Sequence, residues 1–546
     1  SGSQPKQTPA VTSSSPLHRW QFVTLEGQPW YVGSEFAVRR GVDLSVFQKN
    51  VDWAKAAESG VEFAVIRLGF RGYGKGALQP DDLFDSHLDG AHTAGIDAGV
   101  YFFSQALTAE EGREEAQYVL ERLEDAGFAA YAVGGCVRDT LLGRTPGDWD
   151  VTTAARPEQV LALFDGYAIP TGLKHGTVTV RAGEMHIEVT TFRADGTYTD
   201  HRRPDQVFFS DRLEEDLCRR DLTVNAMAMD LRGHITDLYG GREDLEAGIL
   251  RCVGEPERRF EEDALRILRT LRFAAVLGFS VEPRTDAALR VKAPLLRCIA
   301  PERILTEMDK LLCGSHVLPV LLNWPDVLAM FLPEIAPCVG FDQHNRHHIY
   351  DVWGHSAHAV AAVPAEVVLR WTMLLHDIGK PACFTRDEQG VGHFYGHPAI
   401  SADLAADICR RLRMDNRTAE RIVTLVRWHD RDIARTEKAI ARAVSQLGEE
   451  TFRQLLEVKR ADNAAQSPED RCRLADIQQA EDLLNTLLAK RQCFSLKDLT
   501  VKGGDLMALG LRGREVGDAL QYLLNAVLDG TPNDKETLLK LAAERK

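Results

Sequence analysis

The chain has 546 residues, of which 44% are hydrophobic and 27% charged, and it carries a net charge of -15. At about 150 residues per domain, this length predicts three or four units. The acidic balance excludes a protein that coats nucleic acid over its whole surface, so any RNA binding must use a local basic groove. No apolar run reaches the roughly 18 residues that a membrane-spanning helix needs. The ten cysteines are scattered without a CxxC pair, which is typical of reduced thiols in the cytosol.

The first 35 residues predict a linker or disordered segment. Ser1–Pro16 is rich in serine, proline, threonine and glutamine, and such a tract cannot bury enough apolar surface to offset its ordering entropy. It contains no apolar core of the kind that signal peptides have. We therefore expect folded structure to begin near residue 36.

Residues 36–114 alternate between strand and helix patterns. Three apolar stretches are separated by two short helical ones, which predicts a parallel α/β arrangement. The segments GVDLS, VEFAVIRLGF and AGVYFFS resemble the first half of glycoside hydrolase family 25, the barrel muramidases that cleave peptidoglycan. The resemblance implies a truncated half barrel in which Asp43 is one of the family's two catalytic carboxylates.

The second carboxylate of that family lies in a D-x-E motif on a later strand, and the resemblance ends near Leu120, before that motif. Glycoside hydrolysis requires two carboxyl groups that flank one bond. We therefore expect a fragment without lysozyme activity, and we do not expect peptidoglycan to be a partner.

A helix is predicted at the junction, over about 108–127. Ala116, Val119, Leu120 and Leu123 follow helical spacing, which gives the helix one apolar face. Gly127 is expected to end it. A helix of this kind precedes a strand in both neighbouring regions, so the two can be joined through one continuous helix.

The stretch from Tyr131 to Val151 is the centre of the predicted chemistry. It predicts a short strand, a glycine turn, a helical turn and a second strand. Its polar and glycine residues are Gly134, Gly135, Arg138, Asp139, Asp148 and Asp150.

Asp148 and Asp150 lie two residues apart, which on a strand places both carboxylates on one face and Trp149 on the other. Hard divalent cations such as Mg²⁺ take oxygen ligands and bridge phosphates, and glycine lets backbone N–H groups approach those phosphates. The pattern therefore indicates a magnesium-dependent nucleotidyl transfer site. The alternative is that Asp-Trp-Asp forms a solvated turn after Pro146-Gly147.

Two further motifs follow in order, RRDLTVNAMA from Arg219 and EEDALRILRTLRF from Glu261. With these, the chain from about Leu120 resembles the class II tRNA nucleotidyltransferases, or CCA-adding enzymes. They form a branch of the polymerase-beta-like superfamily that also contains bacterial poly(A) polymerases. The resemblance implies an α+β head over 115–244, a helical neck over 245–312, a helical body over 313–480 and a helical tail over 481–546. It assigns nucleotide binding to Gly134, Gly135, Arg138, Asp139, Arg219, Arg220, Asp221 and Asn225.

Two details of the head remain open. Glu188 lies on a predicted hairpin, where it is either a third acidic group of the site or a solvated strand residue. Asp221 either supports the nucleotide or caps the helix that follows. The polar segment between Arg193 and Leu217 is expected to be a mobile loop over the site.

The neck carries Asp263, Arg266, Arg269 and Arg272 at intervals of three residues, which we interpret as the nucleotide-selecting helix. Asp263 and Arg266 would share one face. A carboxylate accepts from the exocyclic amine of cytosine or adenine and a guanidinium donates to the adjacent ring acceptor, whereas uracil and guanine offer a carbonyl at the amine's position. The alternative is an ion pair on a solvated helix.

The body contains HHIYDVWGHSAHAV, LLHDIGKP, YGHPAIS, RWHD and VKRADNAA. The order of His355, His376, Asp377 and Asp462 resembles that of HD-domain phosphohydrolases, in which imidazole and carboxylate groups bind a transition metal or Mg²⁺. His397 and His429 could complete a second metal site. The resemblance implies a secondary phosphatase or phosphodiesterase activity.

The sequence thus predicts a cytoplasmic enzyme that uses CTP and ATP to add or repair the 3′ CCA end of tRNA with Mg²⁺. Two other functions remain open: a poly(A) polymerase, and a metal-dependent phosphohydrolase whose main site is the HD domain. A third reading, a cell-wall-binding module, rests only on the N-terminal fragment.

Overall fold

The computed structural model describes residues 22–545 except for short internal gaps. The gaps are 26–27, 32–40, 46–47, 50, 72–77, 82, 104–108, 165–167, 174–175, 183–184, 196–206, 347 and 468–472. The chain divides into two compact units, which are described separately. Unit 1 comprises 1–193, 209–216 and 228–235, and unit 2 comprises 194–208, 217–227 and 236–546.

The N-terminal segment contains a short hairpin that the sequence did not predict. Strand β1 (Phe22–Leu25) pairs antiparallel with β2 (Gln28–Tyr31), so the expected linker over 1–35 is wrong for these residues. The tract Ser1–Pro16 lies outside the described residues.

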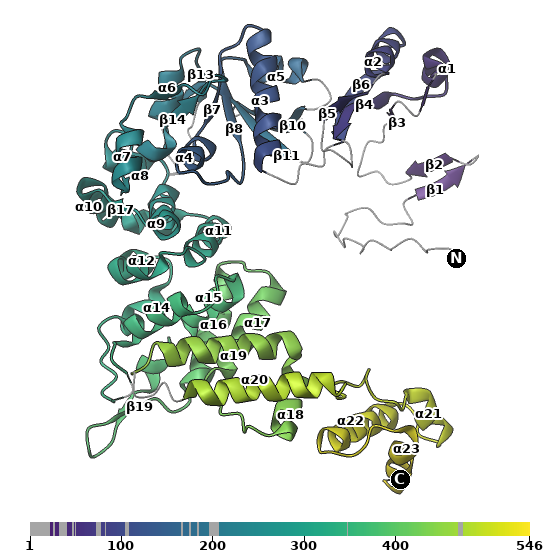
Figure 1. The fold of residues 1–546 in the computed structure, drawn as a ribbon, viewed down its shortest axis with the longest axis vertical. Helices are drawn as coiled ribbons and strands as arrows, with labels where there is room; N and C mark the ends of the chain where they lie inside the picture. Colours follow the sequence, from purple (N-terminus) through teal and green to yellow (C-terminus); the bar gives the residue numbers. More distant parts are fainter. Residues whose placement is uncertain are drawn as a thin grey trace. The chain divides into compact units, whose positions relative to one another are not determined.

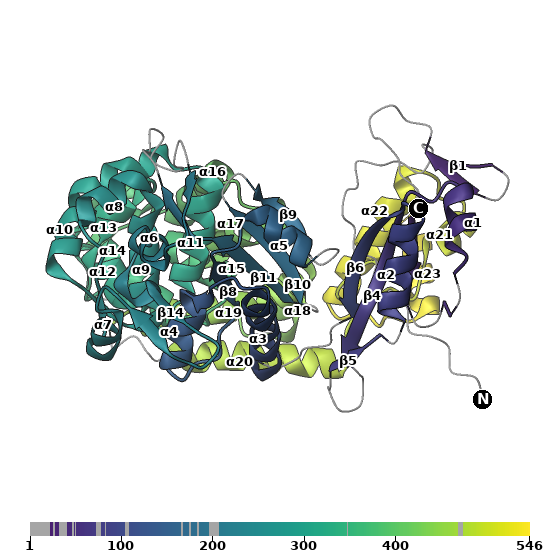
Figure 2. The ribbon, with the colours of Figure 1, turned by 90° about the horizontal axis from the view of Figure 1, so that it is seen from above.

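The half-barrel prediction is confirmed in its element order. Strand β4 (Phe63–Arg71) pairs in parallel with β3 (Gly41–Leu44) and β6 (Asp97–Phe103). Helices α1 (Trp53–Glu58) and α2 (Phe84–Thr93) connect them, and α2 lies along β4 in Figure 2. An additional strand, β5 (Leu78–Pro80), pairs antiparallel with β4.

The junction helix α3 runs over Ala109–Asp125 (Figure 1). Its predicted apolar stripe is confirmed, because Ala116, Val119, Leu120 and Leu123 are all buried. It packs on the sheet of the nucleotidyltransferase-like head, against strands β7 (Ala130–Val133) and β10 (Thr177–Ala182). Gly127 has a φ of +84°, as a C-terminal glycine stop requires.

The head is built on one seven-stranded mixed sheet in the order β15-β14-β7-β8-β11-β10-β9. Strand β8 pairs antiparallel with β7 and parallel with β11, and the predicted hairpin is formed by β10 and β11. The remaining strand bounds are β8 (Asp150–Thr153), β9 (Ala168–Gly172), β11 (Met185–Thr191), β14 (Met227–Met229) and β15 (Ile235–Asp237). Its helices are α4 (Gly135–Leu141), α5 (Pro157–Leu163) and α6 (Leu213–Cys218).

Two short strands, β12 (Arg193–Asp195) and β13 (Val207–Phe209), pair with each other within the predicted loop. The end of that segment belongs to helix α6, so the loop prediction is wrong for residues 213–217. The central part of that loop lies outside the described residues.

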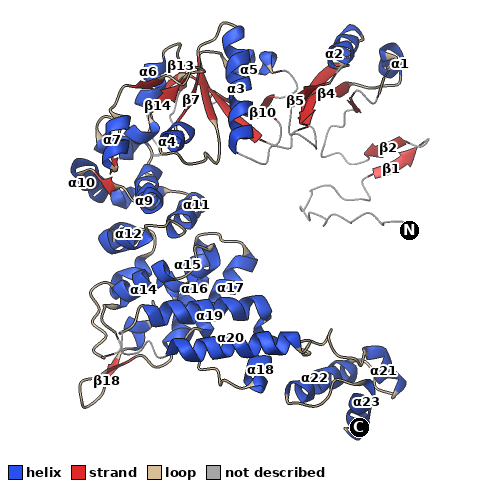
Figure 3. Cartoon of the chain, in the orientation of Figure 1, coloured by secondary structure: helices blue, strands red, loops and turns tan. Residues whose placement is uncertain are grey.

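Unit 2 is almost entirely helical, as Figure 3 shows by its blue ribbon from α7 onward. The neck and the start of the body contain α7 (Gly241–Ala247), α8 (Pro256–Glu262), α9 (Leu265–Leu277), α10 (Pro283–Lys292), α11 (Pro301–Leu312), α12 (Val317–Asn323) and α13 (Pro325–Leu328). Two strand pairs interrupt the helices: β16 (Ile249–Leu250) with β17 (Ser280–Val281), and β18 (Thr385–Arg386) with β19 (Gly392–His393).

The body and tail are also helical, as predicted. The body helices are α14 (Val352–Ala362), α15 (Val367–Leu375), α16 (His397–Arg411), α17 (Asn416–Trp428), α18 (Glu437–Leu447), α19 (Glu449–Ala464) and α20 (Arg473–Ala489). The tail helices are α21 (Gly503–Ala508), α22 (Arg514–Leu528) and α23 (Lys535–Glu544). Buried side chains of α18, α20 and α22 share one apolar core. Among the described helices, none combines the length and the apolar character that crossing a bilayer would require.

Gly241 marks a close packing contact that tests this fold. A Cβ atom at Gly241 would lie 2.3 Å from the carbonyl oxygen of Thr223, so Gly241→Ala must displace α7. We expect it to lower the free energy of unfolding by about 1–3 kcal/mol. The matched control is Gly517→Ala on α22, where no atom lies within 4 Å of the new Cβ, and we expect a gain of about 0.5–1 kcal/mol there. Thermal unfolding of the two variants would show opposite shifts, and equal shifts would contradict the packing described.

Candidate active site and a second, histidine-rich centre

The two carboxylates of the Asp-Trp-Asp motif lie at the start of β8 in unit 1. Asp150 is the first residue of the strand, and Asp148 precedes it in a bend. The prediction that both lie on the strand is therefore wrong for Asp148. Trp149 between them is 3% exposed, whereas Asp148 is exposed and Asp150 partly so, so the expected separation of polar and apolar faces is present.

Glu188 is the register partner of Asp150 on the adjacent parallel strand β11. Directly paired residues of neighbouring strands project from the same face of a sheet, and Glu188 is exposed. Glu188 and Asp150 therefore lie on one face of the head sheet, and a role for Glu188 as a third acidic group stays a prediction.

The glycine turn lies beside these carboxylates. Gly134 has a φ of +82°, which favours glycine. A Cβ at Gly135 would lie 3.7 Å from Nη2 of Arg138 and 4.0 Å from Oδ1 of Asp148. Arg138 is bound in turn by Asp139, with Nε donating to Oδ1 and Nη2 to Oδ2, each at 2.9 Å. The turn, a guanidinium and a carboxylate are therefore neighbours, which suits a cation and a phosphate at the same place.

Asp221 is the centre of a buried polar group in unit 2. Its Oδ1 accepts from Nδ2 of Asn225 at 3.1 Å, and its Oδ2 accepts from Nε of Arg269 at 2.8 Å. Burial by itself would raise the pKa of Asp221, but attraction to Arg269 and these hydrogen bonds hold it well below its usual value. Asp221 is therefore ionised and fixed.

The neck departs from the predicted single helix. Helix α8 ends at Glu262, Asp263 is extended with φ -139° and ψ 104°, and α9 begins at Leu265. Asp263 and Arg266 therefore do not lie one turn apart on one helix. The break has a local cause, because Oδ1 of Asp263 accepts from the Leu265 N–H at 3.1 Å at the start of α9.

Helix α11 holds the row of charged neck residues in place. Nη2 of Arg303 donates to Oδ2 of Asp263 at 3.0 Å. Nε of Arg272 pairs with Oε2 of Glu307 at 2.7 Å. Arg266 is held differently, since it donates to the carbonyl of Arg219 at 2.7 Å and pairs with Glu262 at 2.8 Å.

Arg303 and Glu307 of α11 were not among the residues predicted from the sequence. The available signal was their spacing of four residues, which puts two opposite charges on one helix face. Arg219 and Arg220 are partly exposed, and their roles stay predictions. So does the convergence of the neck with Asp148 and Asp150, which belong to the other unit.

A separate cluster of six ionisable side chains lies in the helical body. Its residues come from α14, from the C-terminal ends of α15, α17 and α19, and from the N-terminal end of α16. The members are His355, His376, Asp377, His397, His429 and Asp462.

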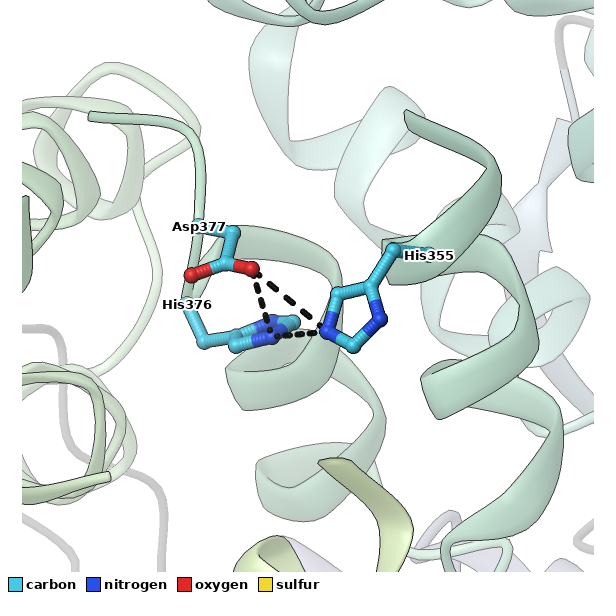
Figure 4. A group of neighbouring side chains, drawn as sticks. All are labelled: His355, His376 and Asp377. Atoms are coloured by element: carbon cyan, nitrogen blue, oxygen red, sulfur yellow. Dashed lines mark hydrogen bonds and ion pairs between the residues drawn. The ribbon is translucent and has the colours of Figure 1, made fainter. Parts of the chain in front are cut away.

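Asp377 is shared by two histidine pairs. Its Oδ2 lies 3.5 Å from Nε2 of His355 and 3.3 Å from Nε2 of His376 (Figure 4). Its Oδ1 lies 3.2 Å from Nε2 of His397 and 3.6 Å from Nε2 of His429. Each oxygen of one carboxylate thus faces its own pair of imidazoles.

Asp462 completes the first half of this centre. Its Oδ1 lies 2.9 Å from Nε2 of His355 and 3.6 Å from Nε2 of His376. The four residues that the sequence grouped as an HD site are therefore brought together by the fold.

The other ring nitrogen of each histidine faces a backbone carbonyl. The Nδ1 atoms of His376, His397 and His429 lie 2.8, 2.8 and 2.6 Å from carbonyls three residues earlier, and Nδ1 of His355 lies 3.3 Å from the carbonyl of Ala465. A carbonyl can only accept, so these bonds place a proton on Nδ1 and direct the Nε2 lone pair inward.

Positive charge is needed where these lone pairs converge. Nε2 of His355 lies 3.3 Å from Nε2 of His376, and Nε2 of His397 lies 3.2 Å from that of His429. Two lone pairs at this distance repel unless a proton or a metal ion lies between them. Burial disfavours a charged His376, yet Asp377 and Asp462 raise its pKa to about 10. The donor set, four imidazoles and two carboxylates, fits divalent metal ions.

Four family models match parts of the chain. The "Poly A polymerase head domain" matches 130–251, "Probable RNA and SrmB- binding site of polymerase A" matches 278–338, and "tRNA nucleotidyltransferase domain 2" matches 385–542. "Glycosyl hydrolases family 25" matches 42–137. The last match overlaps the first over residues 130–137, which include β7 and the start of α4, and it contains the whole of α3.

Curated relatives and a solved structure agree with these matches. The CCA-adding enzyme of Lactococcus lactis subsp. cremoris (strain SK11) is 52% identical over 278 residues, which cover 49% of this chain and 69% of the relative. The crystal structure of the Bacillus stearothermophilus CCA-adding enzyme in complex with CTP matches with a TM-score of 0.60 and 31% identity, over 79% of this chain and 97% of that one. The chain belongs to the family of CCA-adding enzymes.

The family resemblance is not uniform in extent. The CCA-adding enzyme of Leuconostoc mesenteroides is 51% identical over 220 residues, which cover 55% of that relative. The chain thus spans about half the length of the first curated CCA-adding enzymes that it matches. The polymerase-beta-like head and helical remainder expected from the sequence are confirmed by these likenesses.

The pair between Asp221 and Arg269 generates a pH-dependent prediction. In Arg269→Met the buried carboxylate loses its cation, so we expect a loss of about 2 kcal/mol in the free energy of unfolding at neutral pH. This is below the usual cost of breaking a buried pair, because Arg269 is itself 36% exposed.

The sign of the pH dependence follows from the lowered pKa of Asp221. Above the pKa that Asp221 has in the unfolded chain, its ion pair with Arg269 contributes fully to the stability of the native protein. This stabilisation is lost as the pH falls and Asp221 becomes protonated. The difference between native and Arg269→Met should therefore shrink below about pH 4. Urea unfolding from pH 7 to pH 3 measures it, with Asp221→Asn/Arg269→Met as the variant that restores part of the loss. A difference that is constant with pH would rule out the ion pair as its source.

Proposed function

We propose that the protein adds or repairs the 3′-terminal CCA of tRNA from CTP and ATP and releases pyrophosphate. The observation that carries this is the combination of family membership with Asp148, Asp150 and Glu188 beside the Gly134–Gly135 turn. The same proposal gives tRNA, CTP and ATP as partners and the cytoplasm as the place of action.

The head residues supply the cation and phosphate sites. The nucleotidyltransferase family uses a divalent ion, typically Mg²⁺, and Asp148 and Asp150 would hold it, because carboxylate oxygens on one edge are the ligands that Mg²⁺ prefers. Such an ion, when bound, would supply a more nucleophilic hydroxyl and charge neutralisation at the phosphates. Arg138 and the N–H groups of the turn position the triphosphate, and Asp139 fixes Arg138.

The neck residues choose the base. Arg266 donates to Arg219, Glu262 and the carbonyl of Arg259, and Asp263 accepts from Arg303 and the Leu265 N–H. A carboxylate has about four acceptor sites and a guanidinium five donors. Enough remain to read the amine and ring nitrogen of cytosine or adenine. Anchoring also reduces the side-chain entropy lost when a nucleotide binds.

Replacement of Asp150 tests the transfer reaction. We expect Asp150→Asn to lower incorporation of both CTP and ATP into a tRNA that lacks its last three nucleotides by at least about a hundredfold. Thermal unfolding and tRNA binding should stay as in the native protein. The matched control, Glu158→Gln, changes an exposed acidic residue of α5 and should leave incorporation unaltered. Repeated incorporation of ATP alone, without a need for CTP, would instead favour a poly(A) polymerase.

We propose a second activity for the body, a metal-dependent phosphohydrolase at the HD-type centre. It is favoured by the two groups of buried ligands that share Asp377. Four imidazoles suit a transition-metal ion better than Mg²⁺. His355, His376, Asp377 and Asp462 would hold one ion, and His397 and His429 with Asp377 would hold a second.

Metal content and hydrolysis test this second proposal. We expect native protein dialysed against Mn²⁺ or Ni²⁺ to retain two ions per chain by inductively coupled plasma mass spectrometry. His397→Ala should retain one, and Asp377→Asn should lose p-nitrophenyl phosphate hydrolysis while keeping CCA addition. His234→Ala, a histidine whose side chain is 88% exposed, is the control. Full hydrolysis in Asp377→Asn would exclude the centre as its source.

A further inference from the structure

A cavity of about 470 Å³ opens beside the histidine-rich centre. Only two of the six clustered side chains, His429 and Asp462, contribute to its lining. Asp462 is also the one whose carboxylate keeps measurable exposure, at 21%, whereas the side chains of His355, His376 and Asp377 are at most 2% exposed. This cavity therefore gives a substrate an approach to the centre, through His429 and Asp462.

Lys459 lines the same cavity. It lies on α19, three residues before Asp462, so the two side chains share one face of the helix. Its Nζ donates to the carbonyl of His429 at 2.7 Å and to that of Arg431 at 2.8 Å. Two of its three N–H groups are thus fixed by the backbone of a residue of the centre, and the third finds no acceptor among the residues that the structure describes.

We propose that Lys459 is the positioning residue that holds a substrate phosphate at this centre. This inference rests on the phosphohydrolase function proposed above. An ammonium group anchored by two carbonyls is a fixed point charge with one N–H left to donate, which matches a non-bridging phosphate oxygen. In hydrolysis the water oxygen forms a bond to phosphorus, the P–O ester bond breaks, and the leaving alcohol takes a proton. Lys459 neither gives nor takes that proton.

The rest of the cavity restricts the ester. Besides Asp462, the carboxylates of Asp430, Asp432 and Asp476 line it, against the cations Arg435, Lys459 and Arg473. Arg435 lies 3.5 Å from Asp476 and 3.7 Å from Asp432, so its charge is already compensated. Four carboxylates thus line the cavity against three cations, so a second or third phosphate in this cavity would face a net negative wall. The substrate class is therefore a phosphate monoester, and nucleoside triphosphates are disfavoured.

The cavity volume is consistent with one nucleotide or sugar phosphate. Aliphatic side chains of Ile433, Leu456 and Ile477 form part of its wall and provide an apolar surface for the organic part. Both a free nucleotide and a phosphorylated RNA end carry a phosphate monoester. A comparison of CMP with a 3′-phosphorylated oligoribonucleotide distinguishes these two sources.

Lys459→Met, which keeps the aliphatic stem, and Lys459→Arg test the assignment in the full chain loaded with Mn²⁺. We expect both to retain native metal content and thermal unfolding. By calorimetry, inorganic phosphate should bind at least tenfold more weakly to Lys459→Met and be partly rescued in Lys459→Arg. With CMP, KM should rise more than kcat falls. The control is Lys490→Met, whose native lysine pairs with Glu437 at 2.7 Å, outside the cavity.

The outcomes separate the two levels of the proposal. Native protein that holds metal and phosphate while Lys459→Met binds phosphate equally well would overturn the role of Lys459 alone. Native protein that holds no metal would overturn the phosphohydrolase function and this inference with it. Hydrolysis of CMP or of a 3′-phosphorylated oligoribonucleotide, without hydrolysis of CTP, supports the monoester class, and the faster of the two identifies the source. Equal turnover of CTP would overturn that class.

Discussion

A charge that is removed from water must be compensated where it lies, and this constraint shapes both candidate centres of the protein. In the neck, Asp221 is held by Arg269 and Asn225, and Glu307 by Arg272. In the body, one carboxylate is surrounded by four imidazoles. The cost of burying these groups is offset only if each keeps its partner in place. The side chains are therefore presented in fixed positions before any ligand arrives.

The two centres solve this problem differently. In the neck, opposite charges are paired within the protein, which leaves a structure that is complete without a ligand. In the body, Nε2 atoms of paired histidines face each other around Asp377, and Nζ of Lys380 lies 2.7 Å from the same carboxylate. A proton or a bound cation between the paired rings satisfies this arrangement. This difference is consistent with the proposal that the neck residues select a neutral base edge, whereas the body residues form a candidate metal centre.

Much of the fold could be predicted because local pattern and tertiary packing agree. The stripe of Ala116, Val119, Leu120 and Leu123 predicted α3 and its buried face, and alternating apolar residues predicted the hairpin of β10 and β11. The break at Asp263 was missed, because most of EEDALRIL favours a helix. Aspartate can also accept from a nearby backbone N–H, as Asp263 does from Leu265, and its ion pair with Arg303 comes from forty residues later. Histidine and aspartate motifs indicated the body centre, but their spacing could not show that Asp377 faces two pairs at once.

Helix α3 also has a consequence for where such a chain can be cut. Its buried residues pack on the head strands β7 and β10, while the likeness to glycoside hydrolases continues through it to residue 137. A segment that is matched by the glycoside hydrolase model thus supplies part of the hydrophobic interior of the nucleotidyltransferase-like head. The boundary between the two likenesses is therefore not a boundary of packing, and a cut made upstream of α3 would leave this interior intact, whereas a cut made after it would expose β7 and β10.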